Sequence, residues 1–304
     1  MDFRQMRYIV EIAECRSVTK AADNLHVSQS AVSHYIRHAE DSLGVKLFDR
    51  SANPLGLTYA GMVYVESAKR ILTEHDGMKR RLRESSSHVK RLLRIGTSRD
   101  RASYMLPKII PEFMRRCPGT RTEIFTESGQ VLRERLKKGR IDILMLPDDG
   151  KEISPNINAE IIYTEELLLV SKKGFLKIPD GRKYVYPSEI DGFPFFMQYR
   201  EHTTRLFCDA YFRDNDIQPD IVMEFPSNIT CYRMASAGLG LAIVPMMITG
   251  IANPESKTEL YSLSERPRTW DILAYTRKDI PEGQPEQDFI RTARNRFLQG
   301  DTFL

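Results

Sequence analysis

Apolar residues recur at helical spacing between residues 18 and 43, where two short helical patterns meet at a tight turn. The first pattern covers about 18–25, and Thr19 stands where its N-cap is expected. The second follows Ser28, which can accept a backbone N–H and start a helix. Steps of four, three and four place its apolar residues on one buried face, and they are Val32, Ile36, Ala39 and Leu43.

The opposite face of the second helix carries short polar side chains and one arginine. Such side chains can read base edges, which suits a helix whose N-terminal half lies in a DNA major groove. An amphipathic hairpin that binds nothing fits the spacing alone equally well. The candidate DNA-contacting residues here are Thr19, Ser28, Gln29, Ser30, Ser33, His34 and Arg37.

A dense pattern of residues continues from this hairpin to residue 61. It reads Ser17-x-Thr19-x-Ala21-Ala22-x-x-Leu25-x-Val27-Ser28-Gln29-Ser30-Ala31-Val32-Ser33, then Ile36-Arg37-x-x-Glu40-x-x-Leu43-Gly44-x-x-Leu47-Phe48-x-Arg50 and Leu57-Thr58-x-Ala60-Gly61. This pattern resembles the winged helix-turn-helix of LysR-type transcriptional regulators. Ala39 and Tyr59 depart from it, since the family more often has Leu and Pro there.

Two further elements complete this N-terminal part. A helix is expected over 2–15, with Phe3, Met6, Val10 and Ala13 on its apolar stripe. Residues 46–58 are expected to form the wing, because apolar anchors flank a turn rich in Asn, Pro and Gly. Arg50 joins the candidate DNA-binding residues as a phosphate contact, and an ion pair within the domain is its alternative.

A long helix is predicted from Thr58, as its N-cap, to about Ser85. Its apolar residues repeat at alternating steps of four and three, with His75 at one position, which is typical of a coiled-coil-like contact between two copies. A helix that packs on its own domain is the alternative. Resemblance to the family, whose linker helix dimerises, favours the dimer and hence two half-sites on pseudo-palindromic DNA. The expected dimerisation residues are Tyr64, Ala68, Ile71, Met78 and Leu82.

Beyond residue 91, short apolar strands alternate with amphipathic helices, which predicts an α/β fold on a mainly parallel sheet. The expected strands are 92–96, 122–125, 141–146, 167–171, 195–198, 221–224, 241–244 and 270–275. The expected helices are 104–117, 129–138, 204–214, 228–237 and 285–298.

This second half also carries family motifs, namely Leu93-Arg94-Ile95-Gly96, Leu106-Pro107, Gly139-x-Ile141-Asp142 and Ala237-Gly238-Leu239-Gly240-x-Ala242-Ile243-x-Pro245. They resemble the LysR-type effector domain, which is similar to periplasmic binding proteins and has two α/β subdomains joined by two crossing strands. The resemblance implies an all-α winged helix-turn-helix at 1–58, a linker or dimerisation helix with a hinge at 59–90, and an effector-binding domain at 91–304. Subdomain I would comprise 91–163 and 267–304, and subdomain II 164–266.

Ligands of open α/β sheets bind beyond the carboxyl ends of strands and near helix N-termini, and the family places its effector cleft at these loops. Asp100 or Arg101 stands where many relatives have Ser or Thr, which argues against a simple carboxylate effector. Arg101 or Arg205 could pair with an anion, and Asp100 could take a cationic or hydroxylated ligand. The candidate effector-binding residues are Asp100, Arg101, Thr126, Ser128, Gln198, Thr203, Thr204, Arg205, Ser227 and Asn228.

Composition adds little that is specific. Residues 1–90 hold 14 Lys and Arg against 11 Asp and Glu, so most of the net charge of +4 lies in this part and DNA affinity would rest on a few placed cations. The four cysteines have no zinc-site or CxxC spacing and are expected as buried or incidental thiols in a reducing cytosol. Neither a signal peptide nor a membrane span is evident, so a cytoplasmic protein is expected.

The leading hypothesis is therefore a cytoplasmic transcriptional regulator without catalytic activity, metal or cofactor. Its partners would be double-stranded DNA, a small-molecule effector and further copies of itself, as a dimer or the tetramer common in the family, and the resemblance allows contact with RNA polymerase. A solute-binding protein for transport is the alternative, which the helix-turn-helix and the absence of an export signal disfavour. An enzyme is disfavoured because no GxSxG, Walker loop or paired metal-ligand motif occurs.

Overall fold

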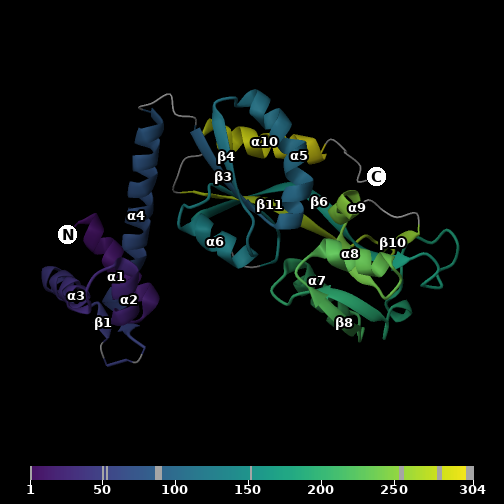
Figure 1. Ribbon diagram of the computed structural model, residues 1–304, viewed down its shortest axis with the longest axis horizontal. Helices are drawn as coiled ribbons and strands as arrows, with labels where there is room; N and C mark the ends of the chain where they lie inside the picture. Colours follow the sequence, from purple (N-terminus) through teal and green to yellow (C-terminus); the bar gives the residue numbers. More distant parts are fainter. Residues whose placement is uncertain are drawn as a thin grey trace. The chain divides into compact units, whose positions relative to one another are not determined.

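The structure is a computed structural model that describes residues 2–49, 51–52, 54–85, 91–150, 153–252, 257–278 and 283–298. The chain divides into two compact units, Met1–Val89 and Lys90–Leu304, which we call the N-terminal unit and the effector unit (Figure 1). No helix among these residues is long and apolar enough to cross a membrane.

The N-terminal unit is helical with one small hairpin. Its elements are α1 (Phe3–Cys15), α2 (Val18–Leu25), α3 (Gln29–Leu43), β1 (Phe48–Asp49), β2 (Gly56–Leu57) and α4 (Tyr59–Ser85). The strands β1 and β2 pair antiparallel, with Phe48 opposite Leu57, so a wing lies in the predicted segment. The core residues are Ile9, Ile12, Ala21, Ala22, Val32, Ile36, Ala39, Leu47, Phe48 and Val65.

Most helix ends agree with the sequence, and one prediction was wrong. Ser28 caps α3 by accepting from the backbone N–H of Ala31 at 3.2 Å, and Thr58 Oγ1 accepts from the backbone N–H of Gly61 at 3.0 Å, both as predicted. However, Ser17 and not Thr19 caps α2, because Ser17 has extended backbone and accepts from Lys20 N–H at 3.3 Å. Thr19 already lies inside the helix.

The buried side of α1 differs from the predicted apolar stripe by a rotation about the helix axis. Ile9 and Ile12 are completely buried, whereas Phe3 is exposed at the start of the helix and stacks on His75 with ring centroids 3.8 Å apart. The reason is that α1 packs against three neighbours, α2, α3 and α4, which together cover the side holding Ile9 and Ile12. Leu43, predicted on the buried stripe of α3, is also exposed, because it is the last helical residue before Gly44.

Helix α4 crosses the chain next to Leu47 so closely that only glycine fits. A Cβ atom on Gly61 would lie 1.9 Å from the carbonyl oxygen of Leu47. Val65, Ala68 and Leu72 are buried further along the helix, which contacts α1. Ala68, predicted on the dimer seam, therefore offers no surface to a partner, whereas Ile71, Met78 and Leu82 remain 44%, 44% and 58% exposed.

The effector unit alternates strands and helices, as predicted. Its elements are β3 (Arg91–Thr97), α5 (Arg99–Arg116), β4 (Thr120–Phe125), α6 (Gly129–Lys137), β5 (Ile143–Pro147), β6 (Ile157–Lys172), η1 (Pro187–Glu189), β7 (Pro194–Gln198), α7 (Thr203–Asp214), β8 (Asp220–Phe225), α8 (Asn228–Ser236), β9 (Ala242–Pro245), α9 (Met247–Ala252), β10 (Thr258–Ser262), β11 (Thr269–Arg277) and α10 (Gln284–Leu298).

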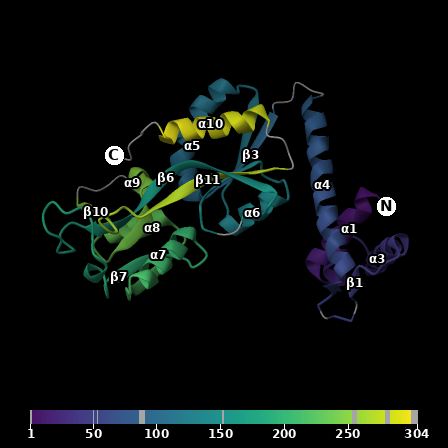
Figure 2. The same cartoon turned by 180° about the vertical axis from the view of Figure 1, so that it is seen from behind.

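The sheet is less parallel than predicted. Strand β3 is parallel to β4 and β5, and β7 is parallel to β8, but every pairing of β6 and β11 is antiparallel. The reason is that β6 and β11 are the two long crossing strands. The first part of β6 pairs with β11, and residues from 167 onwards pair with β9 and β10 (Figure 2).

These crossing strands connect two layered parts of the effector unit. Helices α5 and α10 lie side by side over one face of the sheet formed by β3, β4, β5 and β11, and α6 covers the other face (Figures 1 and 2). The second part contains β7, β8 and β9 with α7 and α8 (Figure 1). The carboxyl end of β5, the start of α7 and the strand β11 meet where the two parts join.

Candidate functional site

The polar face of α3 is presented to solvent. Ser28, Gln29, Ser30, His34 and Arg37 are exposed, and Ser33 is half-buried. Ser28 also serves as the N-cap, and its Oγ lies 2.8 Å from that of Ser30. Thr19 is exposed on α2, and Arg50 lies outside the described residues. The predicted DNA-contacting side chains of α3 therefore belong to one helix whose opposite face is buried.

A buried carboxylate joins this helix to the wing. Glu40 on α3 is 2% exposed, and its Oε1 accepts from the backbone N–H groups of Leu47 and Phe48 at 2.9 and 3.2 Å. Its Oε2 accepts from Lys46 Nζ at 3.0 Å. Burial opposes ionisation, but these hydrogen bonds outweigh it and hold the pKa of Glu40 below its usual 4.5.

We expect Glu40→Ala to lower the free energy of unfolding of the N-terminal unit by about 3 kcal/mol, because two buried N–H groups lose their acceptor. Calorimetry and circular dichroism of the full chain measure this change. The only tryptophan, Trp270, lies in the effector unit, so its fluorescence identifies the other transition.

The matched control is Asp41→Ala, which removes the neighbouring exposed carboxylate of α3 and should change stability by less than about 0.5 kcal/mol. Since the pKa of Glu40 is lower in the folded unit, the unfolded chain takes up a proton first as the pH falls. The stabilisation is therefore complete above pH 4.5 and is lost as the pH falls through the folded pKa. Equal acid sensitivity of Glu40→Ala and the unaltered protein would contradict this role.

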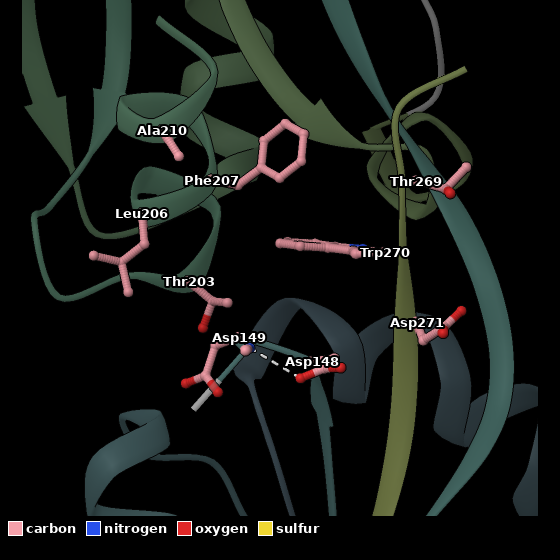
Figure 3. A pocket seen from close by; sticks show the side chains of 10 residues that line it. Asp148, Asp149, Thr203, Leu206, Phe207, Ala210, Thr269, Trp270 and Asp271 are labelled. Atoms are coloured by element: carbon pink, nitrogen blue, oxygen red, sulfur yellow. Dashed lines mark hydrogen bonds between the residues drawn. The ribbon is translucent and has the colours of Figure 1, made fainter. Parts of the chain in front are cut away.

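The effector unit contains a pocket of about 430 Å³ where its two parts join (Figure 3). This volume falls in the usual range for small-molecule sites. The lining comes from the end of β5, from the first turns of α7 and from β11, so a ligand there would touch both parts. The lining residues are Asp148, Asp149, Gly150, Thr203, Leu206, Phe207, Ala210, Thr269, Trp270 and Asp271.

Trp270 connects this pocket to a buried polar network. Its indole ring projects from β11 into the pocket, with Phe207 to one side and Thr203 to the other (Figure 3). The Phe207 and Trp270 ring centroids are 6.1 Å apart at 71°. The indole Nε1 donates to Glu165 Oε1 at 3.0 Å, which holds the ring in its orientation.

Glu165 is the centre of a buried ion pair. Arg101 Nη2 donates to Glu165 Oε1 at 2.8 Å, and the two side chains are 1% and 0% exposed. Arg101 Nη1 also donates to the Tyr163 hydroxyl at 2.6 Å, and burial raises the pKa of that phenol well above its usual range. The Met247 N–H donates to Glu165 Oε2 at 3.3 Å. The network thus joins α5, β6, β11 and α9 at the strand crossing.

Asp100, next in the chain, makes a second buried link between the two parts. Its Oδ2 accepts from the backbone N–H and the Nδ2 of Asn228 at 3.1 and 3.3 Å, and its Oδ1 accepts from Ser227 Oγ at 3.4 Å. The carboxylate therefore lies at the N-terminus of α8, where backbone N–H groups attract negative charge. Gln198 Nε2 continues the link by donating to Asn228 Oδ1 at 2.9 Å.

The structure brings only part of the predicted effector set to the pocket. Thr203 lines it, whereas Arg101 turns away into the ion pair with Glu165. Arg205 is buried and pairs with Asp209 and Glu224, and Thr204 is buried. The remaining predicted residues lie outside the pocket lining. Four of them form the buried link, namely Asp100, Gln198, Ser227 and Asn228. Ser128 caps α6, and Thr126 is absent from the lining.

Sequence reasoning missed the pocket residues outside Thr203. Asp148 and Asp149 follow the predicted strand 141–146, so the rule on carboxyl ends of strands applied to them as well. Trp270 is the only tryptophan of the chain and begins the last predicted strand. No local signal marked Leu206 and Phe207, which lie inside a helix.

Three titratable groups near these networks favour neutral forms, namely His202, Cys208 and Cys231. Burial lowers the pKa of His202, which immediately precedes α7, so its imidazole is neutral near pH 7. Burial also raises the pKa of Cys231 to about 12 and that of Cys208 further. These thiols therefore stay protonated and unreactive, which does not favour a redox-sensing role. The described residues contain no group of three or more His, Cys, Asp or Glu that could hold a metal ion.

Family models match both units. Residues 3–62 match the bacterial regulatory helix-turn-helix protein model of the lysR family, and residues 86–298 match the LysR substrate binding domain. The chain belongs to the LysR family. It is a LysR-type DNA-binding transcriptional regulator with an effector-binding domain, and the alternative of a separate solute-binding protein is not favoured.

Named relatives and solved structures agree with this assignment. The Hca operon transcriptional activator HcaR of Escherichia coli is 28% identical over 247 residues, which cover 81% of this chain and 82% of HcaR. A full-length OxyR variant of Pseudomonas aeruginosa shares the fold, with a TM-score of 0.63 at 20% identity over 97% of this chain and 95% of OxyR. Full-length CbnR in complex with its target DNA aligns with a TM-score of 0.58 at 22% identity, over 97% of this chain and 100% of CbnR.

Proposed function

We propose that this LysR-type regulator reads a pseudo-palindromic DNA site with the α3 helices of a dimer and senses a small molecule bound beside Trp270. The exposed polar face of α3 carries the DNA part of the proposal, because its buried side is fully used by the unit's core. CbnR, a LysR family transcriptional regulator, has been solved in complex with its target DNA, which supports DNA binding by this chain. A cytoplasmic location follows from this role.

The reading residues are proposed to be those at the N-terminal half of α3. Gln29, Ser33 and Arg37 lie at steps of four, so their side chains project from one side of the helix. Arg37 can donate two hydrogen bonds to a guanine edge, and Gln29 can pair with adenine. The wing around Arg50 would contact phosphate and position the helix.

The effector part of the proposal rests on the pocket that both parts of the effector unit line. A ligand that fits one arrangement of the two parts better than another shifts the equilibrium between arrangements. Trp270 would couple a ligand in the pocket to the strand crossing, because its indole N–H is bonded to Glu165 there. Differential binding of the effector is sufficient to couple the pocket to DNA binding, so the proposal contains no catalytic step, metal or cofactor.

Selection of bound sequences from random DNA by the full chain tests the DNA part. We expect two related half-sites in inverted orientation. We expect Arg37→Ala to weaken binding to the selected site by about tenfold or more and to relax the preference at one base pair. Arg115→Ala is the matched control, because Arg115 is exposed on α5 of the effector unit. Recovery of no common motif, or equal effects of the two variants, would overturn the proposal.

A further inference from the structure

The pocket beside Trp270 is lined by acidic groups. Asp148, Asp149 and Asp271 contribute carboxylates to the lining, and none of the described lining residues is Lys, Arg or His. Asp149 is paired with Arg133 at 2.9 Å, and the Asp271 carboxylate accepts from Thr164 Oγ1 at 2.5 Å. Asp148 accepts from the Gly150 N–H at 3.0 Å and is exposed. Arg133 offsets the charge of Asp149, and the carboxylates of Asp148 and Asp271 leave the lining residues with a net negative charge.

An aromatic face lies across the pocket from two of these carboxylates. Figure 3 shows the Trp270 indole edge-on, with Phe207 on one side and Asp148 and Asp149 on the other. The indole N–H is bonded to Glu165 and Trp270 is 8% exposed, so the part of the ring that lines the pocket would present its π face to a ligand rather than its donor. An indole face attracts cations more strongly than the other aromatic side chains do.

The positive groups nearest the predicted effector site are poorly suited to bind a ligand carboxylate. They are either paired with carboxylates of the protein or weaker than the negative charge beside them. At the N-terminus of α8, Asp100 supplies a carboxylate from the protein itself. Arg101 and Arg205 are buried in ion pairs of their own. The N-terminus of α7 does border the pocket at Thr203, but its charge of about +0.5 is smaller than the negative charge that Asp148 contributes after Arg133 has offset Asp149.

We infer that the effector of this regulator is an organic cation, a protonated amine or quaternary ammonium compound whose charged group lies between the Trp270 face and the carboxylates of Asp148 and Asp149. Leu206, Phe207 and Ala210 would cover its apolar part. The inference rests on the proposed function, since it specifies the chemical class of the ligand for the pocket assigned there.

Trp270 provides a direct readout, because it is the only tryptophan in the chain and lines the pocket. The full chain is titrated with choline and with benzylammonium, and its emission is compared with titrations of their uncharged analogues, 3,3-dimethylbutan-1-ol and benzyl alcohol. Benzoate serves as the anionic probe, and sodium chloride keeps the ionic strength constant. We expect the two cations to change the emission in a saturable way and at concentrations at least tenfold lower than their neutral analogues.

Substitutions at Asp148 test whether the cations bind at this pocket. Because Asp148 is exposed, these substitutions are compatible with folding. We expect Asp148→Asn to weaken cation binding about tenfold and Asp148→Lys to abolish it, while the matched control Asp180→Asn, at an exposed position away from the lining, leaves it unchanged. A saturable response to neither cation, equal binding of the neutral analogues, or tighter binding of benzoate would overturn the inference.

The DNA selection described above separates this inference from the proposed function. A regulator that selects a palindromic site and responds to benzoate through Trp270 would keep the proposed function and overturn the cationic effector. A protein that binds the cations at Trp270 but selects no DNA motif would support the ligand class and overturn the proposed function.

Discussion

Arg101→Met should lower the free energy of unfolding of the effector unit by about 3–5 kcal/mol, because it leaves the Glu165 carboxylate buried without its cation. The two side chains are almost completely inaccessible, so water cannot replace the lost partner. Denaturant unfolding followed by Trp270 fluorescence measures the change in this unit alone, since the N-terminal unit contains no tryptophan.

Two further variants show whether the ion pair is the cause. Arg116→Met removes an exposed partner of Glu112 from the same helix, and we expect a loss below about 0.5 kcal/mol. Adding Glu165→Gln to Arg101→Met should recover part of the stability, because a neutral amide leaves no unpaired buried charge and its single carbonyl oxygen can still accept from Trp270 Nε1. A loss below about 1 kcal/mol for Arg101→Met would contradict the buried-charge explanation.

Ile71→Lys should separate the proposed dimer and weaken binding to the full palindromic site by about 10²–10⁴-fold, since each half-site would then be bound independently. Ile71, Met78 and Leu82 follow one stripe of α4 at steps of seven and four and remain exposed in the single chain. Sedimentation velocity measures the assembly state, and titration of the full site and of a single half-site measures the DNA affinity.

The matched control for this variant is Glu66→Lys. It introduces the same side chain at an exposed position on the other side of α4. We expect it to stay assembled and to bind the full site normally. If Ile71→Lys remains a dimer, the stripe on α4 is not the contact. If it becomes monomeric but still binds a single half-site as the unaltered chain does, the loss at the full site is due to assembly alone.

Elements were predictable where their signals lie within one helix or strand. The α3 stripe of Val32, Ile36 and Ala39 is buried as expected, and Ser28 and Thr58 cap their helices as expected. Two of the errors occurred where a neighbouring helix decides which side is covered. The buried side of α1 depends on α2, α3 and α4, and Ala68 is covered because α4 lies against α1. Periodicity finds an amphipathic face but does not say which neighbour covers it.

The candidate effector site was less predictable because its contacts join distant residues. Asp100 and Asn228 are 128 positions apart, and Arg101 and Glu165 are 64 positions apart. The rule that ligands bind at the carboxyl ends of strands brought Thr203 into the predicted set, but the other loops it selected do not line the pocket. It did not show which side chains in those loops bond to one another and which remain on the pocket surface.

The sequence by itself determined the family, the two-part organisation and the helix that carries the proposed DNA-reading residues, because all three depend on motifs and on spacing within short segments. Only the tertiary structure decided that Asp100 and Arg101 are used inside the protein and that Asp148, Asp149 and Trp270 border the pocket. The physical reason is that burying a charged group requires a partner. Folding brings Glu165 to Arg101, whereas Asp148 remains exposed beside the Trp270 face.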